Sequence, residues 1–392
     1  MPRIVIIGAG PAGIIASNTF AKSLKPSDKT EVVILEKNKY YYNTVGAPRA
    51  YTDEKYMPNM FIPYDKAIPK EASSFIKIIR GVATAITTDE VVYHKVGNDD
   101  KPQDAASTLA FDYLLIATGS SYTTPIKQDV NDYSRSGTEA QLKEVRDQII
   151  KAKKILVVGG GSVGCEIAGD IAAHFPEKKV TIIDGHDRLL SANNLLEKFF
   201  TKLTNSLNEL KIDVILGETL EERLTENRFE KRVLRTSKGR EIESDIQLLC
   251  AGFSPVAELV QNLDASLVDS KGAVRVNPHL QLDSMNYHHI FAIGDVNNSS
   301  APKLAYWAGE QAKYVVNKIV GLIRKTQTTV TKPFPNVGLE VLFLPLGPNG
   351  GVIQLPFFGG LVFGNFLTRM FKSKDMLAGR IWANFGATAP GV

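Results

Sequence analysis

Three acidic residues, Glu36, Asp184 and Asp295, stand where a carboxylate could bind a nucleotide. Each follows a run of apolar residues, so each is expected at the carboxyl end of a buried strand. Glu36 and Asp184 each lie about 20 residues beyond a glycine cluster, a spacing at which the carboxylate accepts hydrogen bonds from ribose hydroxyls. The acids therefore predict two nucleotide sites.

Both glycine clusters have the spacing Gly-x-Gly-x-x-Gly and stand between an apolar run and a helical pattern. The first comprises Gly8, Gly10, Pro11, Ala12 and Gly13, and the second Gly159, Gly161 and Gly164. The first glycine permits a tight turn, the second lets a pyrophosphate approach the backbone, and the third lets helix and strand pack closely. The amide end of the helix then faces the anion. Two chance matches, each with a downstream acid, are improbable.

The elements that position these residues predict an α/β fold with two Rossmann-like dinucleotide-binding domains. An apolar strand ending in Gly294-Asp295 follows the second unit and is expected to return to the first sheet. We therefore expect a discontinuous first domain over 1–123 and 270–330, with the second domain, 124–269, inserted in it. A small C-terminal α+β region, 331–392, completes the chain.

Composition excludes several functions. A net charge of +4 on 392 residues does not suggest a nucleic-acid binder. The two cysteines, Cys165 and Cys250, form no CxxC pair, which argues against a disulfide scaffold, a zinc site and a redox-active disulfide. The six histidines have no metal-ligand spacing, so we expect no metal.

Targeting signals are not apparent. A core strand begins at Arg3, so we expect no signal peptide, and Pro2 excludes N-myristoylation. No apolar run approaches the roughly 20 residues of a membrane span. We expect a cytoplasmic protein, with peripheral contact to a membrane, a lipid droplet or the mitochondrial outer surface as further options.

The motifs taken together resemble the two-dinucleotide-domain flavoprotein reductases over residues 1 to about 325. They are the two glycine clusters, Ala117-Thr-Gly-Ser120, Cys250-Ala-Gly-Phe-Ser-Pro255 and Ala292-Ile-Gly-Asp295. Further stretches are similar to the apoptosis-inducing-factor-like branch, namely 43–49, 346–352 and 371–375. The resemblance implies FAD in the first unit, NAD(P)H in the second, and hydride transfer to flavin followed by reduction of a quinone.

The resemblance also implies roles for individual residues. Arg49, Val82 and Asp295 look like FAD contacts, and Glu166 looks like the acid near the nicotinamide–flavin junction. Backbone at Thr118, Gly119, Gly252 and Gly294 is expected to pass close to ligand, and a helix from Leu304 is expected to point its amide end at the flavin. Lys372 is the candidate on the acceptor side.

Asp184 bears on the choice of nicotinamide cofactor. A carboxylate there accepts a ribose 2′-hydroxyl and repels a 2′-phosphate, which favours NADH. His186 and Arg188 lie just beyond and could compensate a phosphate, so NADPH stays open.

The C-terminal region is expected to form a hairpin, from 337–346 and 352–358, and then a helix over 361–371. Phe363, Phe366, Leu367, Met370 and Phe371 share one face of that helix, with cations beside them. Three hypotheses compete: core packing, a lid admitting an apolar quinone, and a membrane-surface helix over 357–374. The last two can coexist.

Two other functions stay open. One is a ferredoxin- or rubredoxin-type reductase with a protein acceptor, and the other is an NADH-sensing interaction protein with little turnover. The resemblance also allows a homodimer.

Overall fold

The first sheet of the computed structural model, which describes residues 1–390, draws its seven strands from two distant parts of the chain. Its order is β17 (Ile290–Ala292), β8 (Tyr113–Ile116), β1 (Arg3–Ile7), β2 (Glu31–Glu36), β5 (Ile76–Ile86), β6 (Glu90–Val96) and β7 (Pro102–Ala110). The strands from β17 to β5 are parallel, whereas β5, β6 and β7 form an antiparallel extension. The return of β17 beside β8 makes this unit discontinuous.

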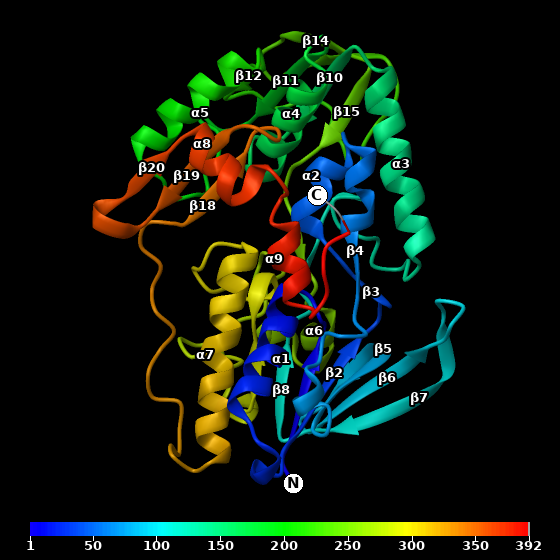
Figure 1. The fold of residues 1–392 in the computed structure, drawn as a ribbon, viewed down its shortest axis with the longest axis vertical. Coiled ribbons are helices and arrows are strands. Elements are labelled where there is room, and N and C mark those ends of the chain that lie inside the picture. The colour runs from blue at the N-terminus through cyan, green and yellow to red at the C-terminus, as the bar shows by residue number, and fades with distance from the viewer. Residues whose placement is uncertain (391–392) are drawn as a thin grey trace.

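Two long helices lie side by side on this first sheet. Helix α1 (Pro11–Ser23) packs along α7 (Ala305–Ile323), blue against gold in Figure 1, although nearly 300 residues of sequence separate them. Apolar side chains of both helices share a core with β1 and β2. Consequently α7 packs both on α1 and on the turn Gly294–Val296, which follows β17 and lies beside Ala12 of the first glycine cluster.

The second sheet is wholly parallel, with the order β12 (Asp213–Leu216), β11 (Lys179–Asp184), β10 (Lys154–Val158) and β15 (Ile246–Leu249). Helices α3 (Arg135–Lys151), α4 (Ser162–His174) and α5 (Glu197–Glu209) accompany it. The predicted fold class, α/β with two Rossmann-like units, is therefore confirmed. Between the units, β9 (Ser120–Ser121) pairs with β16 (Ser254–Pro255) where the chain crosses over and back.

Smaller elements complete the two units. They are β3 (Tyr40–Tyr42) paired with β4 (Phe61–Pro63), β13 (Arg232–Arg235) paired with β14 (Glu241–Ser244), and the short helices α2 (Ala47–Ala50) and α6 (Glu258–Leu263).

The C-terminal region forms an antiparallel sheet of three strands, β18 (Leu342–Pro345), β19 (Gly351–Leu355) and β20 (Leu361–Phe363). It packs on α4 and α5 of the second unit (Figure 1). The expected hairpin is confirmed, but the helix expected from Leu361 is wrong at its start, because 361–363 pair with the edge of β19. Helix α8 (Asn365–Thr368) follows, then a π-helical turn (Arg369–Ser373) and α9 (Ala378–Ala383).

The glycines of each cluster differ sharply in what surrounds them. A Cβ at Gly13 would lie 1.9 Å from the Gly8 carbonyl oxygen, and a Cβ at Gly164 would lie equally close to that of Gly159. At Gly10 and Gly161, by contrast, a Cβ would meet no atom within 4 Å. The third glycine is therefore a packing requirement, while the second faces open space.

This contrast leads to a paired prediction. We expect Gly10→Val to fold normally but to lose bound FAD, because the new side chain fills the space that a pyrophosphate would occupy. Gly13→Val should instead destabilise the protein by about 3 kcal/mol or more, because helix and strand must separate. Flavin absorbance and chemical denaturation measure the two effects. A yellow Gly10→Val protein would contradict the assignment of the first unit.

Candidate functional site

A cleft of about 1080 Å³ lies between the two dinucleotide-binding units. Its lining includes the first two glycines of each cluster and also Glu340, Leu342 and Lys372 from the C-terminal region. Ligand pockets of about 300–1,000 Å³ are usual for small molecules, so the cleft has the room that extended ligands need. It opens at the carboxyl ends of β1 and β10, where ligands bind in sheets of this kind.

The first acid lies where the sequence predicts it. Glu36 lines the cleft, and its carboxylate accepts hydrogen bonds from the backbone amides of Ala9 (2.7 Å) and Asn38 (2.8 Å). Burial raises the pKa of this carboxyl, and the two amides oppose that rise. Pro11, Ala12 and Val82 line the cleft beside it.

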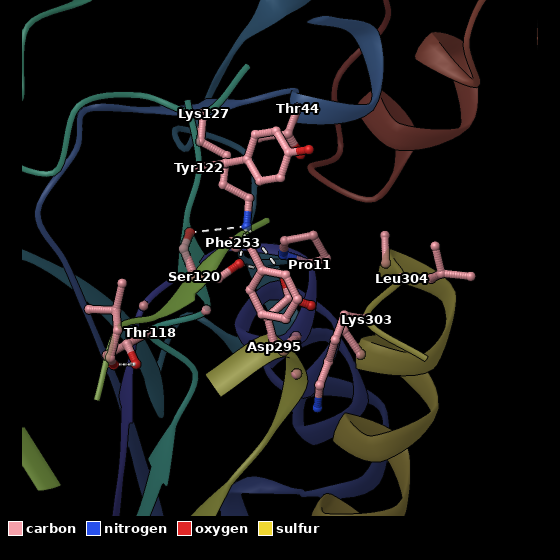
Figure 2. A pocket seen from close by; sticks show the side chains of 18 of the residues that line it. Pro11, Thr44, Thr118, Ser120, Tyr122, Lys127, Phe253, Asp295, Lys303 and Leu304 are labelled. Carbon is pink, nitrogen blue, oxygen red and sulfur yellow. Dashed lines mark hydrogen bonds and ion pairs between the residues drawn. The ribbon is translucent and has the colours of Figure 1, made fainter. Parts of the chain in front are cut away.

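Asp295 lines the cleft shortly after β17, the strand that returns to the first sheet. Its Oδ2 accepts a hydrogen bond from Ser120 Oγ (2.8 Å) and pairs with Lys127 Nζ (3.1 Å), as the dashed lines in Figure 2 show. Lys127 also contacts Ser120 directly. The sequence gives no signal for Lys127, because this residue lies in the linker and belongs to no motif, whereas Ser120 belongs to Ala117-Thr-Gly-Ser120.

Other predicted first-unit residues surround Asp295. Thr118, Gly119, Gly294 and Leu304 all line the cleft, and Figure 2 shows Thr118 and Leu304 on its opposite sides. Thr118 donates its hydroxyl to the Val256 carbonyl (2.6 Å), which ties the two crossing segments together. Leu304 is the cap of α7, so the amide end of that helix faces the cleft.

Asp184 marks the second unit's side of the cleft, together with Gly159, Gly161 and Gly252. Its Oδ2 accepts a hydrogen bond from Gly160 N (2.6 Å), and its Oδ1 contacts both the backbone N (2.8 Å) and ring Nδ1 (2.7 Å) of His186. His186 also lines the cleft. Arg188 does not, because it pairs with Glu197 (3.7 Å) and stacks on Phe200.

Glu166 and Lys372, which are far apart in sequence, meet at the cleft. Lys372 Nζ lies 2.8 Å from Glu166 Oε1 and also donates to the Phe343 carbonyl (3.0 Å). Both side chains are nearly buried, at 9% exposure for Glu166 and 13% for Lys372. Burial raises the pKa of Glu166, and the neighbouring ammonium opposes that rise. The structure thus places the candidate acid near the nicotinamide–flavin junction in direct contact with the candidate residue on the acceptor side.

Three residues that are predicted to lie at the ligands are outside the lining of the cleft, and one of them is Arg49. Arg49 does not line the cleft, because its guanidinium is buried behind it in an ion pair with Asp170. Gly13 and Gly164 also lie off the lining, as their packing role requires.

The residues present fit two dinucleotides. Gly10 and Gly161 each leave open the space that a pyrophosphate needs, and Glu36 and Asp184 stand at the matching strand ends. The starts of α1 and α4 supply the anion-binding helix ends. FAD would be held by the first set and NAD(P)H by the second.

Both cysteines are buried and unpaired, and burial raises their pKa. Such thiols are poor redox relays. Among residues 1–390 no helix is long and apolar enough to cross a membrane, and no cluster of three metal-binding side chains occurs.

Comparisons with known proteins agree with this geometry. Residues 2–312 match the family model for pyridine nucleotide-disulphide oxidoreductases. Apoptosis-inducing factor homolog A of Dictyostelium discoideum is 30% identical over 99% of this chain and 93% of its own length. Human ferroptosis suppressor protein 1 is 28% identical over 99% of this chain and 97% of its own length.

Solved structures share the fold. The sulfide:quinone oxidoreductase of Aquifex aeolicus superposes with a TM-score of 0.73 over 100% of this chain and 93% of that one, at 16% identity. At that identity the likeness concerns architecture alone. The family model and the relatives carry the assignment: the chain belongs to the pyridine nucleotide-disulphide oxidoreductase family, in its apoptosis-inducing-factor-like branch.

Proposed function

We propose that the protein passes electrons from NADH, through FAD, to a quinone. The observation that carries the proposal is the wall of the cleft built by the C-terminal region, which brings an exposed apolar surface next to Lys372. The acceptor is proposed as a quinone because quinones are apolar apart from two carbonyl oxygens. With both thiols buried, the electrons are expected to leave the flavin directly.

The exposed surface consists of five large side chains, which we call the apolar rim: Phe357, Phe358, Phe366, Met370 and Phe371. Phe358 is 95% exposed and Phe366 is 79% exposed. The core-packing hypothesis is therefore wrong for the rim residues of α8 and the π-helical turn. Phe371 packs edge-on against Phe343, and the Phe343 carbonyl accepts a hydrogen bond from Lys372, which lines the cleft. The rim is therefore one residue away from the cleft.

The reaction needs protons as well as electrons. NADH, a quinone and one proton give NAD⁺ and a hydroquinone, so one proton must come from outside the two reactants. FAD, when bound, accepts the hydride and releases the electron pair. Glu166, with its pKa raised by burial, can hold a proton at the cleft, and the Lys372 ammonium can stabilise negative charge on a quinone oxygen.

The rim also suggests where a long-chain quinone comes from. Exposed cations, Arg369 and Lys374, flank the apolar side chains of the rim. Aromatic residues bordered by cations bind at anionic lipid surfaces. We therefore propose that the rim contacts the surface of a membrane or lipid droplet from the cytoplasmic side.

Steady-state assays test the quinone proposal. We expect rapid NADH oxidation with ubiquinone analogues and none with ferredoxin. Turnover with ferredoxin alone would support the protein-acceptor alternative. A long-lived charge-transfer complex with negligible turnover would support the NADH sensor.

Glu166→Gln should reduce quinone turnover by about a hundredfold, because the amide cannot deliver a proton. The raised pKa of Glu166 means that its protonated form persists to higher pH than in an ordinary glutamate. Turnover of the wild-type protein should therefore fall as pH rises through that pKa. The pH profile of kcat measures this, and a Glu166→Gln protein that keeps the same falling limb would remove the acid role.

Asp184→Ala should weaken the preference for NADH over NADPH, because the carboxylate no longer repels a 2′-phosphate. We expect the ratio of kcat/KM values to fall about tenfold, a change of roughly 1.4 kcal/mol. Asp213→Ala is the matched control, since this exposed carboxylate at the start of β12 lies off the cleft. An unchanged ratio would show that Asp184 does not select the cofactor.

The double variant Phe358→Ser, Phe366→Ser should bind anionic liposomes at least about tenfold more weakly, because it lacks the favourable transfer of two phenyl rings from water into lipid. KM for a long-chain quinone should rise, while a short water-soluble analogue is unaffected. Val233→Ser, at an exposed apolar site on β13, is the control. Unaltered liposome binding by the double variant would exclude the rim as the lipid contact.

A further inference from the structure

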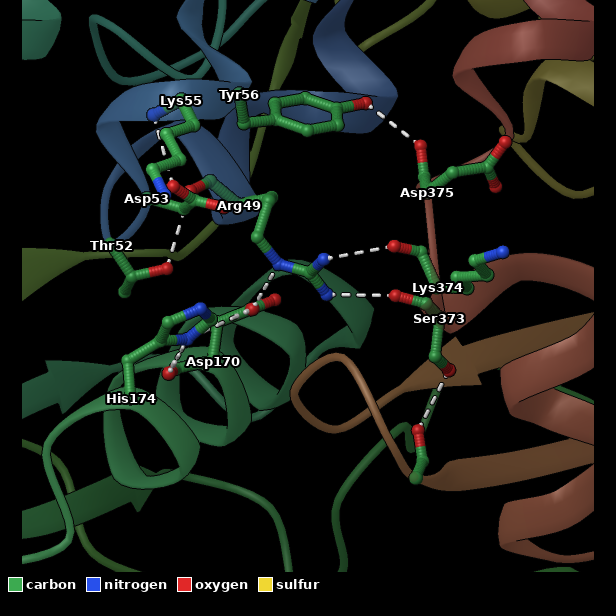
Figure 3. Close-up of polar contacts among 11 residues, drawn as sticks. Arg49, Thr52, Asp53, Lys55, Tyr56, Asp170, His174, Ser373, Lys374 and Asp375 are labelled. Carbon is green, nitrogen blue, oxygen red and sulfur yellow. Dashed lines mark hydrogen bonds and ion pairs between the residues drawn. The ribbon is translucent and has the colours of Figure 1, made fainter. Parts of the chain in front are cut away.

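Arg49 joins three parts of the molecule at one guanidinium. It lies on α2 of the first unit, and its Nε contacts Oδ1 of Asp170 on α4 of the second unit at 2.5 Å. Its Nη2 donates to the Ser373 carbonyl (2.9 Å) and its Nη1 to the Lys374 carbonyl (3.4 Å), both in the C-terminal region. Figure 3 shows the guanidinium between the carboxylate and these two carbonyls.

This contact is fully enclosed. The side chains of Arg49 and Asp170 are 4% and 0% exposed. A buried ion pair adds little to the stability of the fold, because the cost of desolvating both charges opposes their attraction. We therefore look for a role of this pair other than stabilisation. A guanidinium presents donors in a rigid fork, which allows it to hold a carboxylate and two carbonyls at once, whereas a lysine could not do so in this geometry.

The placement along α4 supplies that explanation. Glu166 and Asp170 are four residues apart on α4 and therefore lie on the same face of the helix. Glu166 binds Lys372 directly, and Asp170 binds, through Arg49, the two carbonyls that follow Lys372 in the chain. Successive residues of the C-terminal segment are thus fixed to successive turns of one helix.

Two further hydrogen bonds hold the same segment. Ser373 Oγ donates to the Gly350 carbonyl (2.7 Å), and Tyr56 OH donates to the Asp375 carbonyl (3.1 Å). The segment 369–375 includes the π-helical turn, whose wider backbone geometry is frequent at functional sites. Among these contacts, Arg49 is the charged residue of the first unit that binds the segment, whereas Tyr56 is neutral.

We propose that Arg49 is a positioning residue for the acceptor step: it fixes segment 369–375 on α4 so that Lys372 meets Glu166 at the cleft. The part that Lys372 plays in this step rests on the proposed quinone reductase function. Arg49 itself touches neither the cleft nor a reactant. Its loss should therefore affect the oxidative half of the reaction and leave reduction by NADH intact.

The test compares the two half-reactions in variants of the full-length, FAD-loaded protein. Arg49→Met alone strands the buried Asp170 carboxylate, so it is paired with Asp170→Leu, which removes both charges together. In this double variant we expect flavin reduction by NADH, followed by stopped flow, to stay within about twofold of wild type. We expect kcat/KM for a ubiquinone analogue to fall about tenfold to a hundredfold, as displaced reactive groups do.

Hydrogen exchange supplies a readout that does not depend on the acceptor. Backbone amides of 369–375 should exchange faster in the double variant, while those of β1 and β10 do not change. Arg49→Lys keeps a positive charge beside Asp170 but lacks the forked donors of a guanidinium. It should therefore be as stable as the wild type, while hydrogen exchange in the segment stays fast and kcat/KM for the quinone stays low. Arg146→Met is the matched control, because this other buried arginine contacts Glu54 and not the C-terminal segment.

Two outcomes would overturn the proposal. One is unchanged exchange in 369–375 and unchanged acceptor kinetics once Arg49 is replaced. The other is an equal loss in both half-reactions, which would make Arg49 a general structural residue. If the wild-type protein reduces no quinone, the proposed function fails, whereas the exchange data still decide whether Arg49 orders the segment.

Discussion

Buried charge on one face of α4 is the feature on which the C-terminal wall of the cleft depends. Glu166 meets Lys372 there, and Asp170 meets Arg49, so two carboxylates one turn apart face two cations from different parts of the chain. Each charge is removed from water and needs its partner. The C-terminal region therefore cannot shift along α4 without exposing a charge to an apolar surrounding. That constraint places the wall with a precision that apolar packing alone would not provide.

The cleft separates two tasks. Backbone geometry cradles the dinucleotides, through the open space at Gly10 and Gly161 and the helix ends beside them. Such a cradle is common to many reactions and says little about the acceptor. The proposed acceptor side consists of side chains instead, with Lys372 at the cleft and the apolar rim outside it. In the proposed function, the same short segment links the lipid-facing rim to the reacting groups.

Much of the fold could be predicted from the sequence, because it follows from local pattern. Apolar runs, glycine spacing and a strand ending in Gly294-Asp295 predicted both sheets and the return of the chain, and they placed Glu36 and Asp184 at strand ends. The failures concern contacts between distant residues. No local pattern indicates that the Arg49 guanidinium contacts Asp170 and two carbonyls of the C-terminal segment. Lys127 lies in a linker without periodicity, so its ion pair with Asp295 could not be predicted. Residues 361–363 fit a helical spacing, and nothing in that spacing indicates that they pair with the edge of β19.

The central claim is that electrons leave the flavin for a quinone at the wall that Lys372 and Glu166 form. It is tested most directly by reducing the FAD-loaded protein with NADH under anaerobic conditions and mixing it with single acceptors while flavin absorbance is followed. The account predicts rapid reoxidation by a ubiquinone analogue, slow reoxidation by ferredoxin, and a selective loss of the quinone reaction in Lys372→Met. Flavin that stays reduced in the presence of quinone, or that reoxidises equally fast in Lys372→Met, would contradict it.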